Sequence, residues 1–317
     1  MGNEKETSNR IGLALGSGSS RGWAHIGVIR ALSEVGIKPD VVCGCSVGAL
    51  VGASYATGML DQLEQWVPSL TKLEFARFFE LNLSLKGFID TERLHAFLAG
   101  HVCGEDDRIE HLAKTYAAVS TELETGREIW FTRGRVMEAV RASMSLPGLF
   151  PPVQHDGKWL VDGGLVNPVP VSLCRSLGAD IVIAVNLNGD IVGKHVSQKG
   201  TTTDSESIID RFTRSFKSYS TTLFPSPEPE NTPPALFDAI ALSLNIMQDR
   251  VTRSRMAGDP PDIHLAPKLS HIGLLEAYRG KEAIWEGREC VRRMLPEIQY
   301  VLGMTPQGAE TEKKKAK

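Results

Sequence analysis

The chain has 317 residues, of which 42% are hydrophobic and 23% charged, and its formal net charge is −3. These values allow a substantial hydrophobic core, and we expect one large α/β domain. A slightly acidic chain lacks the basic surface that nucleic-acid binding requires, so nucleic acid is not expected as a partner. The five cysteines show no paired metal spacing, which indicates a reduced, intracellular protein with no metal site and no cofactor.

The first segments predict a strand, a Gly/Ser loop and a helix. Ile11–Leu15 is a short apolar run, and residues 24–35 have the apolar spacing of a helix. The loop between them reads Gly16-Ser17-Gly18-Ser19-Ser20-Arg21-Gly22. Backbone N–H groups in such a loop can hold an anion, either a nucleotide phosphate or the oxyanion of an acyl-transfer intermediate. The nucleotide motifs do not match, because Arg21 stands where a third glycine is required, so the oxyanion is favoured.

A G-x-S-x-G pentapeptide follows, Gly44-Cys45-Ser46-Val47-Gly48. Residues 40–43 before it resemble a buried strand, and residues 49–57 after it resemble a helix that ends at Gly58. This is the context of a nucleophile elbow, where a sharp turn exposes the serine hydroxyl. Taken alone, the pentapeptide is equally consistent with a Gly-rich helix start that buries Ser46.

A third segment, Asp162-Gly163-Gly164, follows an expected hairpin whose turn is Asp156-Gly157. An aspartate at a strand end, with glycines that allow another chain to come close, suits a general base that reaches a serine hydroxyl. In isolation, a turn aspartate is the commoner interpretation of such a sequence.

Together and in this order, the three segments resemble the patatin-like phospholipase family, in particular its compact bacterial members. The resemblance includes the stretch Ala139–Val153 before the aspartate, and it extends from about Ile11 to Leu187 and more loosely to Leu295. It implies a three-layer α/β/α fold with a mostly parallel central sheet. It also implies a serine lipid acyl hydrolase with a two-residue active site and no histidine.

By this resemblance Ser46 is the nucleophile and Asp162 is its base, acting through an acyl-enzyme. Backbone amides of Ser17, Gly18 and Ser19 form the oxyanion hole. The supporting residues are Arg21, Gly22, Gly44, Gly48, Gly163 and Gly164.

Two features depart from the family pattern or compete with it. Most members have glycine where this chain has Ser17 and Ser19, and a positive φ at either serine would be strained. A Ser-Asp-His triad would share the same elbow, and His264 and His271 both follow Asp162 in the order that it requires. His264 falls at an expected exposed strand position, His271 at an expected helix start and His25 in the first helix, so the dyad is favoured.

The other expected elements alternate between strand and helix, which favours a parallel sheet. We expect a helical stretch over 61–112, strands over 116–122 and 128–132, a helix over 135–143, a helix over 172–177, a strand over 179–187, a helix over 236–256, a strand over 263–266 and a helix over 277–300. We expect a polar tail over 1–10, a catalytic domain over 11–302 and a disordered basic tail over 303–317.

From about Asp190 to Pro234 the sequence becomes rich in Ser, Thr and Pro, which predicts a flexible insertion. A basic amphipathic pattern within it has two open interpretations: a lid or membrane contact near the site, or a short helix packed on its own domain. Its apolar positions are Ile208, Ile209, Phe212, Phe216, Tyr219 and Leu223.

The expected partner is therefore a lipid or acyl-ester substrate, and the expected function is hydrolysis of phospholipid or lysophospholipid esters. A regulatory or scaffold protein with weak esterase activity is the alternative. The polar first ten residues predict no signal peptide, and no apolar run spans a bilayer. We expect a cytoplasmic protein, with peripheral membrane contact left open and no oligomeric state predicted.

Overall fold

The computed structural model describes residues 9–72, 91–190 and 236–304. The expected amphipathic pattern at 208–223 and nearly all of both expected tails lie outside these residues. Within them, eight strands form one mixed sheet in the order β5-β6-β3-β2-β1-β7-β8, with β4 also paired to β3. The strands are β1 (Ile11–Leu15), β2 (Val41–Cys45), β3 (Thr115–Glu122), β4 (Glu128–Phe131), β5 (Val153–His155), β6 (Lys158–Asp162), β7 (Ile181–Val185) and β8 (Ile263–Leu265).

Strands β3, β2, β1, β7 and β8 are parallel neighbours, and β4, β5 and β6 extend the sheet by antiparallel pairing. The central strands are apolar because helices cover both of their faces. Alternate side chains divide between two cores, so that Leu13 and Leu15 join the larger one and Ala14 the smaller one. The expected three-layer α/β/α fold with a mostly parallel sheet is confirmed.

The larger core receives α1, α2, α6 and α10, and the smaller core receives α7 and Met256 from the end of α9. The helices are α1 (Ala24–Glu34), α2 (Val47–Thr57), α3 (Leu60–Trp66), α5 (Thr91–His101), α6 (Val136–Ser143), α7 (Val171–Ser176), α9 (Leu236–Gly258) and α10 (Gly280–Val301). Short 3₁₀ helices occupy Ser19–Trp23, Val67–Ser69, Ile109–His111, Gly163–Leu165 and Ala277–Arg279.

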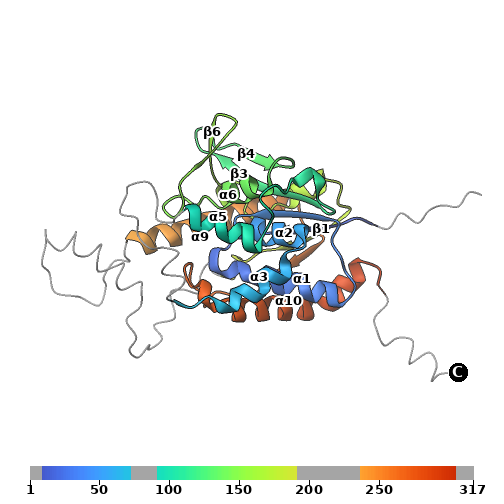
Figure 1. Cartoon of the computed structure of the whole chain (residues 1–317). Helices are drawn as coiled ribbons and strands as arrows, with labels where there is room; N and C mark the ends of the chain where they lie inside the picture. Colours follow the sequence, from blue (N-terminus) through green and yellow to red (C-terminus); the bar gives the residue numbers. More distant parts are fainter. Residues whose placement is uncertain (1–8, 73–90, 191–235, 305–317) are drawn as a thin grey trace, which may run out of the picture.

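Helices α1 and α10 lie side by side at one edge of the molecule (Figure 1). Their contact depends on two glycines. A Cβ on Gly27 would lie 1.9 Å from the carbonyl oxygen of Ile284, and one on Gly287 would lie 2.0 Å from that of Ala24. The two backbones therefore touch directly, which fixes α1 and the loop before it against the C-terminal helix.

Most expected elements are present, with shifted ends. The strand expected at 40–43 continues to Cys45, and the helix expected from 49 already begins at Val47, so the elbow contains Ser46 alone. The helical stretch expected over 61–112 is broken into shorter helices, and residues 73–90 are outside the described part. The helix start expected at His271 is wrong, because residues 270–272 form a turn and α10 begins at Gly280.

Candidate active site

Ser46 occupies the one-residue turn between β2 and α2. Its φ of 56° and ψ of −125° are unusual for a residue other than glycine, which stores roughly 1–3 kcal/mol of strain and exposes the hydroxyl. The flanking glycines allow close packing. A Cβ on Gly48 would lie 2.2 Å from the carbonyl oxygen of Leu15, and one on Gly44 would lie 2.4 Å from the Cα of Ala49. The sequence thus builds a strained elbow at the N-terminus of α2.

The sheet register brings Asp162 to this turn. Strand β3 pairs with β2 as far as Cys45 opposite Val119, and with β6 from Asp162 opposite Ser120. Strands β2 and β6 therefore end toward each other along the same side of β3. Ser46, which comes directly after Cys45, meets Asp162 at this junction.

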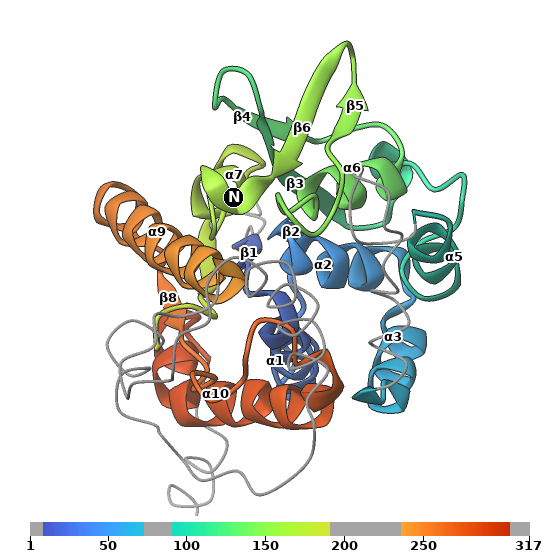
Figure 2. The same ribbon diagram turned by 90° about the vertical axis from the view of Figure 1, so that its left-hand side faces the viewer.

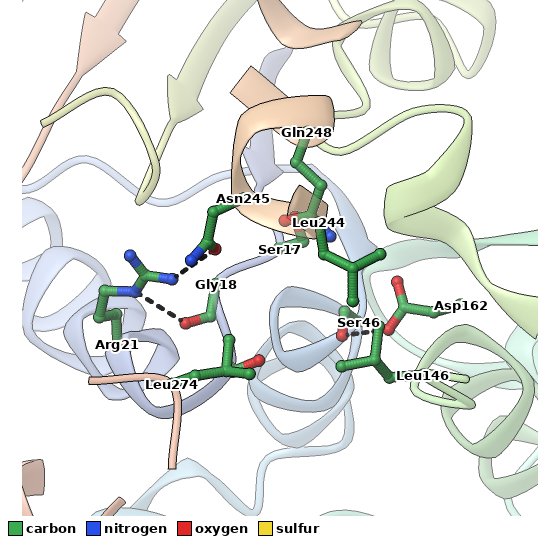
Figure 3. A pocket seen from close by; sticks show the side chains of 11 residues that line it. Ser17, Gly18, Arg21, Ser46, Leu146, Asp162, Leu244, Asn245, Gln248 and Leu274 are labelled. Atoms are coloured by element: carbon green, nitrogen blue, oxygen red, sulfur yellow. Dashed lines mark hydrogen bonds between the residues drawn. The ribbon is translucent and has the colours of Figure 1, made fainter. Parts of the chain in front are cut away.

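The two side chains are hydrogen-bonded, and Figure 3 shows them facing each other at one end of a pocket. Ser46 Oγ donates to Asp162 Oδ2 at 2.6 Å, and the backbone N–H of Gly164 donates to Asp162 Oδ1 at 2.7 Å. Asp162 is only 1% exposed. Burial raises its pKa to about 6, against the two hydrogen bonds, which lower it. At neutral pH the carboxylate is ionised and can accept a proton from Ser46.

The end of α6 holds both members of this pair. Ser143 Oγ accepts the backbone N–H of Ser46 at 2.9 Å, and the carbonyl of Ser145 accepts the backbone N–H of Asp162 at 3.0 Å. Leu146 lines the pocket itself. None of these roles was predicted, although the three residues fall within the stretch that resembles the family.

The Gly/Ser loop after β1 forms the opposite side of the pocket. The N–H of Gly16 donates to Val185 at 3.0 Å, and that of Ser17 donates to Pro168 at 2.8 Å. The Ser17 N–H is therefore already bonded and is not available to an oxyanion. Of the three predicted donors, the N–H groups of Gly18 and Ser19 are left. No hydrogen bond between described residues uses the backbone N–H of Gly18 or Ser19. Ser19 has a φ of 48°, so the positive φ considered for the two serines is found at Ser19 and not at Ser17.

Arg21 is a buried cation beside this loop, 1% exposed. Its Nε donates to the carbonyl of Gly18 at 3.2 Å and its Nη2 donates to Asn245 Oδ1 at 3.1 Å. Burial lowers its pKa to about 10, so it stays protonated at neutral pH. Figure 3 shows the Gly18 carbonyl turned toward Arg21. Because the C=O and N–H of a trans peptide point in opposite directions, Arg21 orients the Ser19 N–H away from itself.

Helix α9 closes the pocket with Leu244, Asn245 and Gln248. Gln248 Oε1 accepts hydrogen bonds from Ser17 Oγ at 3.1 Å and from Asn188 Nδ2 at 2.9 Å. Its amide nitrogen lies beside Gly164, where an added Cβ would be 2.5 Å away. Gln248 thus connects the oxyanion loop with the backbone turn that follows the aspartate. The sequence offered no signal for it.

The remaining predicted glycines serve close packing. A Cβ on Gly22 would lie 2.2 Å from the side chain of Val47, and one on Gly163 would lie 2.3 Å from the carbonyl oxygen of Val119. The pocket holds about 290 Å³ of empty space, part of it open to solvent, and Leu274 completes its apolar lining.

The histidines take other roles. His25 is fully buried, with Nε2 2.7 Å from the carbonyl of Gly16, and burial lowers its pKa to about 4, so it is neutral. His264 is exposed on β8, as expected, and His271 contacts Glu282 at 2.6 Å. None of these lines the pocket. Among the described residues, Ser46 and Asp162 are therefore joined directly, and no histidine lies between them or lines the pocket.

Within the described ranges, no cluster of three or more His, Cys, Asp or Glu side chains is arranged to hold a metal ion. Over the same residues, no helix combines the length and the apolar character needed to cross a membrane. All five cysteines are unpaired and buried.

Several known proteins and one family model are similar to this chain. A family model described as "Patatin-like phospholipase" matches residues 13–175. An uncharacterised NTE family protein of Mycobacterium tuberculosis is 32% identical over 91% of this chain and 92% of its own length. "Neuropathy target esterase sws" of Drosophila melanogaster is 35% identical over 57% of this chain, but the match covers only 13% of that protein. Among solved structures, VipD from Legionella pneumophila matches 91% of this chain and 67% of its own, with a TM-score of 0.43 and 13% identity.

Proposed function

Because the chain belongs to the patatin-like phospholipase family, we propose that it is a serine lipid acyl hydrolase with a Ser46–Asp162 dyad. Its substrates are acyl esters of phospholipids or lysophospholipids. The observation that carries the proposal is the 2.6 Å hydrogen bond from Ser46 Oγ to a buried carboxylate at a strained strand-to-helix turn. A hydroxyl in that position is pre-aligned for proton transfer to its base.

In the acylation step, Ser46 Oγ attacks the ester carbonyl carbon while its proton passes to Asp162. The carbonyl oxygen becomes an oxyanion. The N–H groups of Gly18 and Ser19, the N-terminus of α2 and the nearby charge of Arg21 stabilise it. When the intermediate collapses, the bond to the leaving alcohol breaks and Asp162 returns the proton to the alcohol oxygen. The acyl group remains on Ser46.

Deacylation repeats these steps with water. Asp162 accepts a proton from a water molecule, whose oxygen attacks the acyl carbonyl. The same oxyanion donors hold the second intermediate. Its collapse breaks the bond to Ser46 Oγ, which recovers the proton from Asp162, and the fatty acid leaves. One carboxyl thus serves as base and acid in turn, which suits a pKa of about 6.

The supporting residues hold this arrangement in place. Gly44 and Gly48 allow the elbow to form, and Arg21 fixes the orientation of the Gly18–Ser19 peptide. No cofactor enters the reaction as proposed. The buried, unpaired cysteines suit a reducing compartment, and we place the enzyme in the cytoplasm, where it meets its lipid substrate at membrane surfaces.

Hydrolysis of a medium-chain p-nitrophenyl ester and of a lysophospholipid tests the dyad. Ser46→Ala is expected to lower kcat/KM by at least about 10³, and Asp162→Asn by about 10²–10⁴. Two matched controls should keep near wild-type activity. Ser54→Ala changes a buried serine of the same helix α2, and Asp156→Asn changes the turn of the same β5–β6 hairpin. A wild type no faster than Ser46→Ala on either substrate would favour the regulatory or scaffold alternative.

A further inference from the structure

Helix α9 has two different faces beside the pocket. Leu244, Asn245 and Gln248 point inward and line it. On the outward face Leu242 is 39% exposed, Ile246 52% and Met247 45%. Figure 2 shows α9 projecting from the body of the molecule on the left. Three neighbouring, partly exposed apolar side chains on the helix that forms the pocket wall mark a candidate interaction surface.

The same outward face carries positive charge further along the helix. Arg250 and Arg253 follow Ile246 at intervals of four and three residues, so they continue the row of exposed side chains. Arg253 is 64% exposed and bonds the buried carboxylate of Asp249. The exposed charged residues from 242 to 258 are all arginines, and the third, Arg255, is paired with Glu128 of β4. The face is thus apolar near the pocket. Beyond it Arg250 adds positive charge, whereas the charge of Arg253 is balanced by Asp249.

We propose that the outward face of α9, formed by Leu242, Ile246, Met247, Arg250 and Arg253, docks on the surface of an anionic phospholipid bilayer. The apolar side chains enter the boundary between headgroups and acyl chains, and the arginines face the lipid phosphates. The choice of lipid as partner rests on the proposed hydrolase function.

The small pocket supports this orientation. The described lining encloses little space, so much of a long-chain lipid is left outside the pocket when its ester reaches Ser46. The part left outside needs an apolar environment, and the bilayer supplies it when α9 lies on the surface.

A second copy of the chain fits the face less well. A stable protein interface buries about 800 Å² on each partner, which three half-exposed side chains do not provide. A bilayer surface requires no such area, because the electrostatic attraction of Arg250 for anionic lipid adds to the apolar contact. Binding should therefore weaken as salt is raised.

Flotation of the full-length protein with vesicles tests the proposal without measuring catalysis. Vesicles of phosphatidylcholine alone are compared with an equimolar mixture of phosphatidylcholine and phosphatidylglycerol. We expect binding to the mixture, a loss of about tenfold or more in Ile246→Asp, and retention in Ile246→Leu. Arg250→Glu should weaken binding to the anionic mixture more than any binding to phosphatidylcholine alone. Trp285 is an exposed aromatic residue on α10, 60% accessible. Trp285→Asp is the matched control and should bind like the wild type.

Hydrolysis then separates docking from chemistry. Ile246→Asp should cleave a short, monomeric p-nitrophenyl ester at the wild-type rate, which also shows that it is folded, but should cleave vesicle phospholipid about tenfold more slowly. Wild-type protein that does not float with either vesicle, or Ile246→Asp that floats normally, would overturn the proposal. Self-association that Ile246→Asp abolishes would assign the face to a second copy instead. Failure of the hydrolase function would appear separately, as absence of turnover of the short ester.

Discussion

Two opposing effects act on the pKa of Asp162. The residue is almost fully buried, which favours the neutral form, and it accepts hydrogen bonds from Ser46 and Gly164, which favour the charged form. The result is a pKa of about 6, between that of an ordinary aspartate and that of histidine. One residue can then perform the acid and base steps that a triad assigns to histidine.

The pH dependence of the reaction follows from this value. Because the base must be ionised, kcat/KM for a soluble ester should rise about tenfold per pH unit below 6 and level off above it. Measuring kcat/KM from pH 4.5 to 8.5 locates this acidic limb of the pH–rate profile. Only pH values at which circular dichroism shows the protein folded are used. An acidic limb with its midpoint near pH 4 would mean that burial does not set the pKa of Asp162. A limb unchanged in the residual activity of Asp162→Asn would assign it to another group.

Ser19 allows a second test at the residue scale. Its φ of 48° costs an L-residue about 1–2 kcal/mol, whereas glycine adopts this angle freely but loses more entropy on folding. Ser19→Gly should therefore leave stability unchanged or raise it by about 1 kcal/mol, and should keep or increase kcat/KM, because the backbone N–H is retained. Urea unfolding and ester hydrolysis measure both. A loss of activity beyond about tenfold would show that the Ser19 hydroxyl itself takes part.

Sequence patterns predicted those residues of the site whose signal is local. Ser46 stands in a pentapeptide and Asp162 precedes two glycines, so both could be identified once the three segments and their order were considered together. Gln248 and Asn245 could not, because their partners Ser17 and Arg21 are more than two hundred residues away. Only tertiary packing brings them together. The occupied Ser17 amide likewise depends on a distant carbonyl, that of Pro168.

At the scale of elements, α9 positions the loop that faces the nucleophile. Gln248 Oε1 accepts hydrogen bonds from the buried Ser17 and Asn188 side chains. The amide nitrogen of Gln248 lies beside Gly164, next to the carboxylate of Asp162. Gln248→Glu retains an acceptor but places a negative charge near Asp162. A nearby like charge disfavours ionisation, so the pH limb should move upward by about one unit. Gln248→Leu removes the acceptor and should cost about 1–3 kcal/mol of stability.

The pH–rate profile of Gln248→Glu distinguishes these roles. A purely structural glutamine would leave the limb at the wild-type pH and change only the unfolding midpoint. An upward shift, with stability closer to wild type than in Gln248→Leu, is the expected result.

The contact between α1 and α10 makes a prediction about stability. A Cβ at Gly287 would lie 2.0 Å from the carbonyl oxygen of Ala24, so Gly287→Ala must separate the helices and should cost about 1–3 kcal/mol. Gly100 of α5 has open space around its Cα, and Gly100→Ala should stabilise by up to about 1 kcal/mol. Urea unfolding of both variants measures the difference. Equal stability would mean that the helices are not held in direct contact.

For the whole molecule, the alternation of strands and helices was sufficient to predict a mostly parallel three-layer fold, because parallel strands need helical crossovers. The meeting of β2 and β6 along β3 was not predictable, since it depends on where β3 changes partner after Val119. That register, rather than any motif, brings Ser46 and Asp162 within hydrogen-bonding distance.

The central claim is that Ser46 forms an acyl-enzyme with Asp162 as its base. Intact-mass spectrometry and peptide mapping after reaction with a fluorophosphonate test it most directly, because this probe traps an activated serine without requiring the natural substrate. We expect one adduct on Ser46, none on that peptide in Ser46→Ala, a rate reduced by about 10² or more in Asp162→Asn and an unchanged rate in Asp156→Asn. Modification of a different residue, or labelling of Asp162→Asn at the wild-type rate, would contradict the dyad.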